Sequence, residues 1–464
     1  MKMHNMNRLR RVALCLCLAL PAPMLLAEVD DEEAAKLGNE LTPLGAERAG
    51  NGKEGMFAIP EWTGGMDHLK AKPAKGSGFI DAFPDEQPLM TITAANYMEY
   101  AEYLSEGQKA LFKAYPETYK MKVYPSHRTA IFPEWIYEET KKNATKVDLV
   151  DDGNGFEDAV KGYPFPIPKS GHEAMWNHMA RYLTTGFRGY VNRAIVNPDG
   201  KYSMARGYFE IAFRYNHPDV NDDNFENKHL YALTTIVSPA SQAGDSYLVH
   251  MPMNRVKDEV RVWIYNTGTR KVRRISEIGY DNPVSTLDGI ITHDQIDMFN
   301  GPMDRYTFKL IGKKENLVSY NNYDFYDGAR KYDELIKPNH PNMDLLRFEM
   351  HRVWVVQAIL REGQGHIYTK RTFYIDEDSW LILLQDIYDE RGEFWRAAES
   401  FAITLYEVPF AVNAAQAHYD LHSRRYALLN LTNEEKNRIE YDFFEKPEYF
   451  TTSRLKKFAE QRHR

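Results

Sequence analysis

The sequence predicts a mainly β protein built on one large antiparallel sheet. From Gly186 onward, several segments alternate apolar and polar residues with the period of a half-buried strand. The sequences between them are short turns, and strands joined by such short loops must be antiparallel, because a parallel connection needs a crossover of a dozen or more residues. A sheet with this many strands is expected to curl towards a barrel or half-barrel.

The first predicted strands form two hairpins. A type I turn sequence at 197–200 follows the strand 191–196 and precedes a run in which every second residue from Phe209 to Tyr215 is apolar. A second hairpin is predicted over 260–274, with its turn at 266–269. Four further strand-like runs predict an up-and-down meander: 353–360, 367–375, 380–388 and 394–406.

The chain before the strands is predicted to contain two helices. Apolar residues recur at helical spacing over 93–114, and the capping box that begins at Ser170 predicts a second helix to about Leu183. Four regions are therefore expected: a signal peptide at 1–27, an extended arm at 28–92, the β domain at 93–422, and a peripheral C-terminal helix and tail at 423–464.

The first residues have the pattern of a secretory signal peptide. Four basic residues precede an apolar run at 12–20, and the small residue Ala27 precedes the first acid, so cleavage after Ala27 and export to the periplasm are expected. Both cysteines, Cys15 and Cys17, lie in that run. The mature chain then has no thiol, which excludes disulfides, thiol catalysis and Cys-ligated metal sites.

Charge and hydropathy restrict the partners of the mature chain. Removing residues 1–27 takes four of the 58 basic residues and none of the 66 acidic ones, which leaves a net charge of −12. An acidic chain of this kind is not expected to bind nucleic acid. The remaining sequence has no long apolar run, so we expect a soluble protein that is at most peripheral to the outer membrane.

No motif in the sequence establishes catalysis. His172 and His178 lie six residues apart, whereas helical zinc sites need four, and no nucleophile elbow, phosphate loop or dinucleotide fingerprint is present. The carboxylates of 376–378, Asp386 and 389–390 are interpreted mainly as solvated turn residues rather than an acid/base pair. No catalytic residue, metal site or cofactor is therefore predicted.

Two compositional features stay open between a structural and a binding role. The basic residues of 270–274 are more typical of a solvated strand face than of a surface for anionic head groups. The chain is 13% aromatic and contains 18 methionines. Such side chains line cavities for apolar ligands, but a large sheet core also uses them.

Several strings resemble a proteobacterial family known as domain of unknown function 1329. They are Phe83-Pro84-Asp85, Thr91 to Tyr97, Leu104 to Gln108, Tyr124 to Arg128, Val262 to Arg274, Asp304 to Lys309, Lys370 to Trp380 and Asp386 to Asp389. The resemblance implies a fold similar to the lipoprotein carrier and receptor of the Lol system, which is an unclosed antiparallel β-barrel with helices over the concave side. It also implies work beside an inner-membrane exporter of the resistance-nodulation-division type and outer-membrane components.

The sequence and the resemblance together lead to the hypothesis of a periplasmic carrier for a lipid-like molecule. Aromatic side chains of the sheet are the candidates for the cavity lining: Phe209, Phe213, Trp263, Trp354, Phe373, Trp380 and Trp395. Two alternatives remain, a periplasmic hydrolase that uses a carboxylate pair and a non-catalytic envelope scaffold protein.

Overall fold

The computed structural model describes residues 29–66, 81–275 and 279–462. The expected signal peptide lies outside these residues. Among the helices of the described chain, none is both long enough and apolar enough to cross a membrane.

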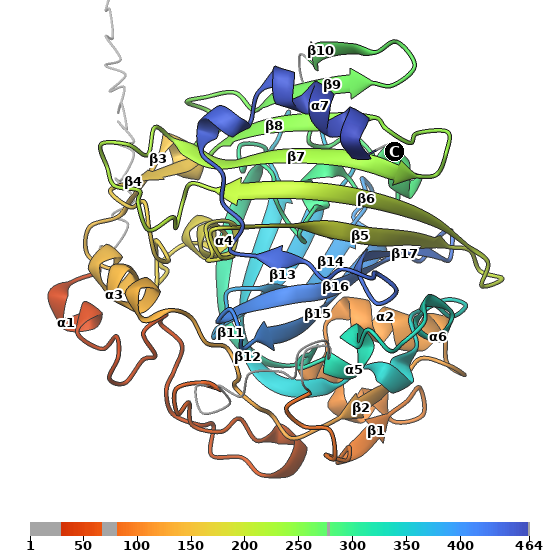
Figure 1. The fold of residues 1–464 in the computed structure, drawn as a ribbon. Helices are drawn as coiled ribbons and strands as arrows, with labels where there is room; N and C mark the ends of the chain where they lie inside the picture. The colour runs from red at the N-terminus through yellow and green to blue at the C-terminus, as the bar shows by residue number, and fades with distance from the viewer. Residues whose placement is uncertain (1–28, 67–80, 276–278, 463–464) are drawn as a thin grey trace, which may run out of the picture.

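The chain forms a large unclosed sheet from two successive antiparallel meanders (Figure 1). The first consists of β5 (Gly186–Val196), β6 (Tyr202–Phe213), β7 (Lys228–Ser238), β8 (Ser246–Pro252), β9 (Arg261–Asn266) and β10 (Lys271–Ile275). The second consists of β11 (Tyr306–Ser319), β12 (Phe348–Leu360), β13 (Lys370–Asp376), β14 (Ile382–Tyr388), β15 (Phe394–Leu405), β16 (Phe410–Asp420) and β17 (Arg425–Leu431). The predicted hairpins and the predicted meander are thereby confirmed.

The last long strand joins the two meanders. β17 pairs with β16 on one side and with β5 on the other, at Ala427 opposite Ile195. The prediction that everything after 422 is peripheral is therefore wrong for this strand, which lies in the middle of the sheet. The seven residues of β17 follow a short turn, and the sequence does not reveal that they pair with a strand more than 200 residues earlier.

Short strands extend or flank this sheet. β1 (Met90–Ile92) pairs with β2 (Met121–Val123), and β2 meets β12 in a parallel bridge at Val123 and Phe348. β18 (Glu440–Tyr441) pairs with β5, and β3 (Asp148–Val150) and β4 (Gly155–Glu157) form a separate hairpin.

The helices are short and lie on both sides of the sheet. They are α1 (Asp31–Ala34), α2 (Glu106–Ala114), α3 (Glu134–Asn143), α4 (Gly171–Met179), α5 (Tyr323–Tyr326), α6 (Tyr332–Leu335) and α7 (Thr452–Arg462). The single helix predicted over 93–114 is in fact two: a 3-10 helix at Tyr97–Tyr103 and α2, because the side chain of Ser105 caps the second one. The predicted cap of α4 by Ser170 is confirmed.

Different elements cover the two faces of the sheet. On the outer face, α2 packs on β14 and β15, and α7 packs on β7 to β9 (Figure 1). On the concave face, α4 packs against β11 and β12, and the segment 279–305 that connects the two meanders lies beside it. The expected helical cover of the concave side is thus provided by α4 together with this connecting segment.

Candidate ligand-binding site

The register of the strands identifies one continuous concave face. Phe373 of β13 lies opposite Gln385, and the row continues through Ala398, His418 and Ala427 to Ile195 of β5. Since side chains alternate along a strand, Arg193 and Val191 share this face with Ile195. By the same register, the concave face continues on β6 with Phe209, Ile211 and Phe213.

One half of the concave face is filled by protein side chains. Met175 and Trp176 of α4 pack with Phe373 and Ile375 in the largest hydrophobic cluster, and Phe299 of the connecting segment joins them. Between this cluster and β7 lies an internal cavity of about 10 Å³, which has room for about one water molecule.

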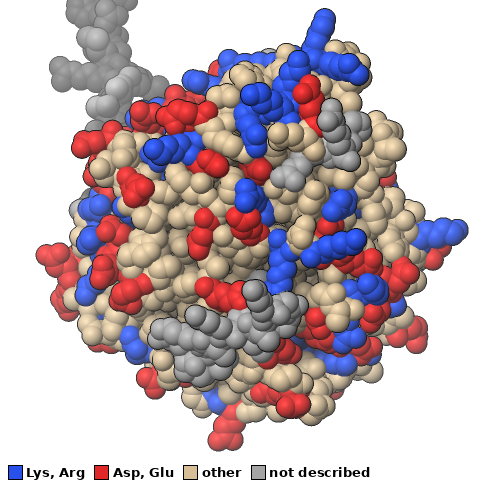
Figure 2. Space-filling view, viewed as in Figure 1, with Lys and Arg blue, Asp and Glu red and all other residues tan. Residues whose placement is uncertain are grey.

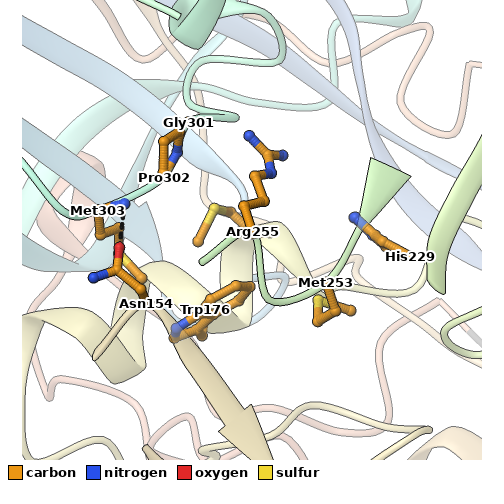
Figure 3. Close-up of a pocket in the computed structure, with 9 residues that line it drawn as sticks. Asn154, Trp176, His229, Met253, Arg255, Gly301, Pro302 and Met303 are labelled. Carbon is orange, nitrogen blue, oxygen red and sulfur yellow. Dashed lines mark hydrogen bonds between the residues drawn. The ribbon is translucent and has the colours of Figure 1, made fainter. Parts of the chain in front are cut away.

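Figure 3 shows the walls of this small cavity. Trp176 of α4 lies opposite Pro302, and Arg255 and His229 lie on the side of β7 and β8. Burial lowers the pKa of His229 to about 3, so this imidazole is neutral at physiological pH. An acyl chain does not fit in a space of this size.

The other half of the concave face is apolar and only partly covered. Ile211, Leu230, Val249 and Ile264 of β6 to β9 share this face by register, and each is partly exposed. None of them belongs to the four hydrophobic clusters of the described residues. We call this surface, formed by the concave side chains of β6 to β9, the open apolar face.

The structure places only two of the seven predicted lining residues on the open apolar face. Phe209 and Phe213 lie there by register, but both are buried, with the ring centroid of Phe187 5.3 Å and 5.7 Å from theirs. Phe373 shares the concave face, but it is fully buried in the filled half. Trp263 points to the outer face, where it joins the cluster around α7.

The three remaining predicted residues pack elsewhere. Trp354 and Trp380 are stacked with ring centroids 6.2 Å apart, and the indole N–H of Trp380 donates to the carbonyl of Leu44 in the N-terminal arm. Trp395 contacts the ring of Tyr368 and the guanidinium of Arg396.

The carboxylates of 376–378 are buried, so their interpretation as solvated turn residues is wrong. Arg128 donates to both carboxylate oxygens of Asp378, at 2.8 Å and 2.7 Å. Glu377 is paired with Arg128, Arg352 and Lys313. The turn therefore buries its charges in an ionic cluster that the sequence alone does not reveal, because the partners come from distant segments.

Three residues of this cluster have the types and spacing of metal ligands. Suitable atoms of His351, Asp376 and Asp378 lie within 4.8 Å of one another. Burial lowers the pKa of His351, but bonds to Asp376 and Glu349 outweigh this and raise it to about 9. A protonated imidazole cannot bind a metal, and Arg128 already neutralises Asp378, so the arrangement fits an ion-pair core better than a metal site.

A second buried pair of carboxylates lies under α2. Asp386 accepts from the backbone N–H of Gly107 at 2.8 Å, and Glu399 accepts from the hydroxyls of Tyr119 and Tyr419, both at 3.1 Å. Burial raises the pKa of both, that of Glu399 to about 7. Neither lines the small cavity or the groove described next.

An open polar groove of about 550 Å³ lies beside the ionic cluster. Its charged lining residues are Asp81, Glu86, Asp324, Asp327, Arg330, Asp344 and Arg347. The guanidinium of Arg347 lies between the rings of Phe83 and Tyr124, 5.0 Å and 4.5 Å from their centroids. None of the seven predicted lining residues borders this groove.

Basic residues gather at the free edge of the first meander. Arg270, Lys271, Arg273 and Arg274 of the β9–β10 hairpin are exposed, and Figure 2 shows Lys and Arg side chains at the end of the molecule where α7 and this hairpin lie. Charged side chains on an edge strand also prevent pairing with other chains.

Comparison with known proteins identifies the family. The model of the family described as "Protein of unknown function (DUF1329)" matches residues 91–456. This chain belongs to that family. It is also 43% identical over 444 residues to an uncharacterized protein of Pseudomonas aeruginosa, an alignment that covers 95% of this chain and 96% of the relative.

Solved structures are similar at low sequence identity. A DUF1329 family protein from Desulfovibrio piger is 14% identical, with 59% of this chain and 92% of that one covered and a TM-score of 0.40. A putative outer membrane lipoprotein-sorting protein domain from Vibrio parahaemolyticus is also 14% identical, covers 58% and 91%, and has a TM-score of 0.39. A LolA superfamily protein from Nitrosomonas europaea is 13% identical, covers 59% and 93%, and has a TM-score of 0.35.

Proposed function

We propose that this protein is a carrier that shields an apolar, lipid-like molecule on the open apolar face. The observation that supports this is the set of partly exposed apolar side chains on the concave side of β6 to β9. A monomeric protein rarely leaves contiguous apolar surface uncovered unless a ligand or a partner uses it. The outer face of the same strands is covered by α7, so the exposure is confined to one side.

The physical need for such a carrier is large. Each methylene left in water costs roughly 0.8 kcal/mol, so a sixteen-carbon tail in water is penalised by on the order of 10 kcal/mol. The filled half of the concave face offers no room for that tail, and the open apolar face supplies the surface that would cover it. The ligand is therefore held on the open apolar face rather than in an enclosed cavity.

The location and partners belong to the same proposal. The signal-peptide pattern of the first 27 residues supports transfer of the ligand within the periplasm. An inner-membrane exporter of the resistance-nodulation-division type would supply the ligand, and outer-membrane components would receive it. Co-purification of the native protein from the periplasm with such an exporter tests this part.

Binding to the open apolar face is tested with a fluorescent fatty acid whose emission rises in apolar surroundings. Wild-type protein is expected to bind the fluorescent fatty acid saturably. The double variant Ile211→Asp/Val249→Asp is expected to bind it at least tenfold more weakly, because two charges then lie on the open apolar face. Ile359→Asp is the matched control and is expected to bind like the wild-type protein, since Ile359 is 45% exposed on β12, outside the open apolar face.

Two results would contradict the proposal. One is the absence of saturable binding by the wild-type protein. The other is equal binding by the wild-type protein and the double variant, provided that circular dichroism shows both to be folded.

A further inference from the structure

Arg193 places a positive charge beside the open apolar face. It lies near the C-terminal end of β5, on the concave side between Val191 and Ile195. Its guanidinium extends across the neighbouring strand: Nη2 lies 3.9 Å from the position that a Cβ atom would take at Gly207 of β6. The guanidinium therefore lies in van der Waals contact with the concave side of β6 at this point.

This guanidinium has no carboxylate partner among the described residues. Its one hydrogen bond is to the hydroxyl of Thr286 in the connecting segment, at 3.3 Å. Arg193 is partly exposed; its partial burial lowers the pKa of the guanidinium, and no acidic group among the described residues opposes that effect. An arginine removed from bulk water without a counter-ion is unusual, because the lost hydration is not replaced.

Three buried arginines on the concave side each have a carboxylate partner. Arg371 is paired with Asp294, and Arg396 with Asp420, at 2.7 Å and 2.9 Å. Arg181 is paired with Asp297. The protein therefore supplies acids to three arginines on this side, whereas Arg193 has none among the described residues and Arg255 bonds only to Asn300 and Met251.

Further hydrogen-bonding atoms on the concave face, two to four strands from Arg193, lack partners in the described structure. They are Nε2 of Gln416, Nδ1 of His418, Oγ of Ser400 and both polar atoms of the Gln385 side chain. All four residues are fully or almost fully buried and share the concave face with Arg193 by register. Buried polar atoms normally have partners, so ordered water or a polar ligand is expected here.

The apolar strip that begins at Arg193 has the length of a hydrocarbon tail. From Gly207, over which the guanidinium lies, the concave residues Phe209, Ile211 and Phe213 follow along β6. Six residues of strand span about 20 Å at about 3.3 Å each, close to the extent of a sixteen-carbon chain. Charge lies at one end of this strip, and along it Ile211 is partly exposed between the buried rings of Phe209 and Phe213.

We infer that Arg193 binds the anionic head group of an amphiphile whose tail lies on the open apolar face. This inference rests on the proposed carrier function and names the class of ligand. The head group is a carboxylate or a phosphate, since a guanidinium binds either through paired N–H donors. Thr286 and the partly unpaired polar side chains of β14 to β16 lie on the same side of the sheet as this head group.

The test compares three ligands of equal tail length on the purified protein. Palmitate carries a carboxylate, palmitoyl lysophosphatidate carries a phosphate, and hexadecanol carries no charge. Each displaces the fluorescent fatty acid already described. Wild-type protein is expected to bind one or both anions at least tenfold more tightly than hexadecanol, and the preferred anion identifies the head group.

The variant Arg193→Met removes the charge and keeps an unbranched apolar side chain of similar length. It is expected to weaken anion binding at least tenfold and to leave hexadecanol binding within about twofold. Arg188→Met is the matched control, because Arg188 lies on the same strand with its side chain paired to Glu440 on the outer face. Its binding of all three ligands is expected to equal that of the wild-type protein.

The outcomes separate this inference from the proposed function. Equal affinity of wild-type protein for palmitate, lysophosphatidate and hexadecanol, or unchanged anion binding by Arg193→Met, overturns the role of Arg193 while the carrier function stands. Failure of all three ligands to bind overturns both. Unliganded Arg193→Met is expected to melt at or above the wild-type temperature, because it removes an unpaired charge, so weaker binding is not caused by unfolding.

Discussion

Arg128 illustrates how single charged residues hold the interior of this protein together. Its guanidinium is almost fully buried, and it neutralises Asp378 and Glu377 at the end of β13. A substitution that removes one partner of such a pair leaves the other charge buried and unpaired, which costs far more stability than the pair itself contributes.

Replacing Arg128 with Met is therefore expected to lower the free energy of unfolding by about 3–5 kcal/mol. Arg188→Met, which breaks the exposed pair with Glu440, is expected to cost about 0–1 kcal/mol. Urea denaturation of both variants measures the difference. Equal effects of the two substitutions would mean that the buried cluster is not a structural centre.

Glu399 is expected to make stability depend on pH. Burial raises its pKa to about 7 in the folded protein, above the ordinary value of 4.5. Between these two values the folded protein keeps a proton that the unfolded chain releases, so this residue's contribution to stability falls as the pH rises towards 7 and levels off above it. The full difference is on the order of 3 kcal/mol.

The variant Glu399→Gln removes this titration while keeping an acceptor for Tyr119 and Tyr419. Relative to wild-type protein, it is expected to gain stability as the pH rises from 4.5 to 7.5. Denaturation curves at several pH values measure this difference, and a gap between the two proteins that does not change with pH would refute the assignment.

At the scale of elements, α2 depends on a glycine for its contact with the sheet. A Cβ atom at Gly107 would lie 2.7 Å from Oδ1 of Asp386 and 2.9 Å from Cβ of Ala397. Alanine at an unhindered helix position is about 1 kcal/mol more favourable than glycine. Here the close approach of helix and strand makes alanine less favourable than glycine.

Gly107→Ala is therefore expected to destabilise the protein by roughly 1–3 kcal/mol. Gly365→Ala is the control, since nothing lies within 4 Å of a Cβ atom at that position. Thermal denaturation distinguishes them. A Gly107→Ala protein as stable as the control would show that α2 can move away from the sheet at little cost.

The elements differed in how well the sequence predicted them. Hairpins and meander strands were predicted correctly because alternation and turn residues are local signals. The break before α2 and the position of β17 were not, since the first depends on one capping side chain and the second on pairing with a distant strand.

The face proposed to bind the ligand was harder to read from the sequence than the strands. Phe209 and Phe213 were placed correctly on one face by their spacing. Aromatic identity alone could not show whether a predicted residue lies on the open apolar face, in the filled half or on the outer face. Arg193 was missed, although its position between Val191 and Ile195 on one face was readable. An arginine between two apolar residues of the same strand face is the signal that would have identified it.

At the scale of the whole molecule, the two halves of the sheet are expected to differ in local stability. The concave side of β12 to β16 is filled by α4 and the connecting segment, whereas Val249 of β8 and Ile264 of β9 are partly exposed on that side and β10 is an edge strand. Local opening is easier where fewer apolar contacts are lost. Amide hydrogen exchange should therefore be slowest in β12 to β16 and faster in β8 to β10.

Bound palmitate is expected to slow exchange mainly in β6 to β9, because the ligand covers those strands and stabilises the state that binds it. Hydrogen-exchange mass spectrometry with and without palmitate measures both effects. Uniform exchange across the sheet, or protection by the ligand confined to β12 to β16, would contradict this division of the molecule.

The position of β17 determines when the protein can finish folding. All other strands of both meanders precede β17 in the chain, so both must be available before the strand that bridges them exists. Until then the chain carries two sheets with free edges at β5 and β16. A protein truncated after residue 422 should accordingly remain a pair of unjoined halves, prone to aggregation and to capture by chaperones.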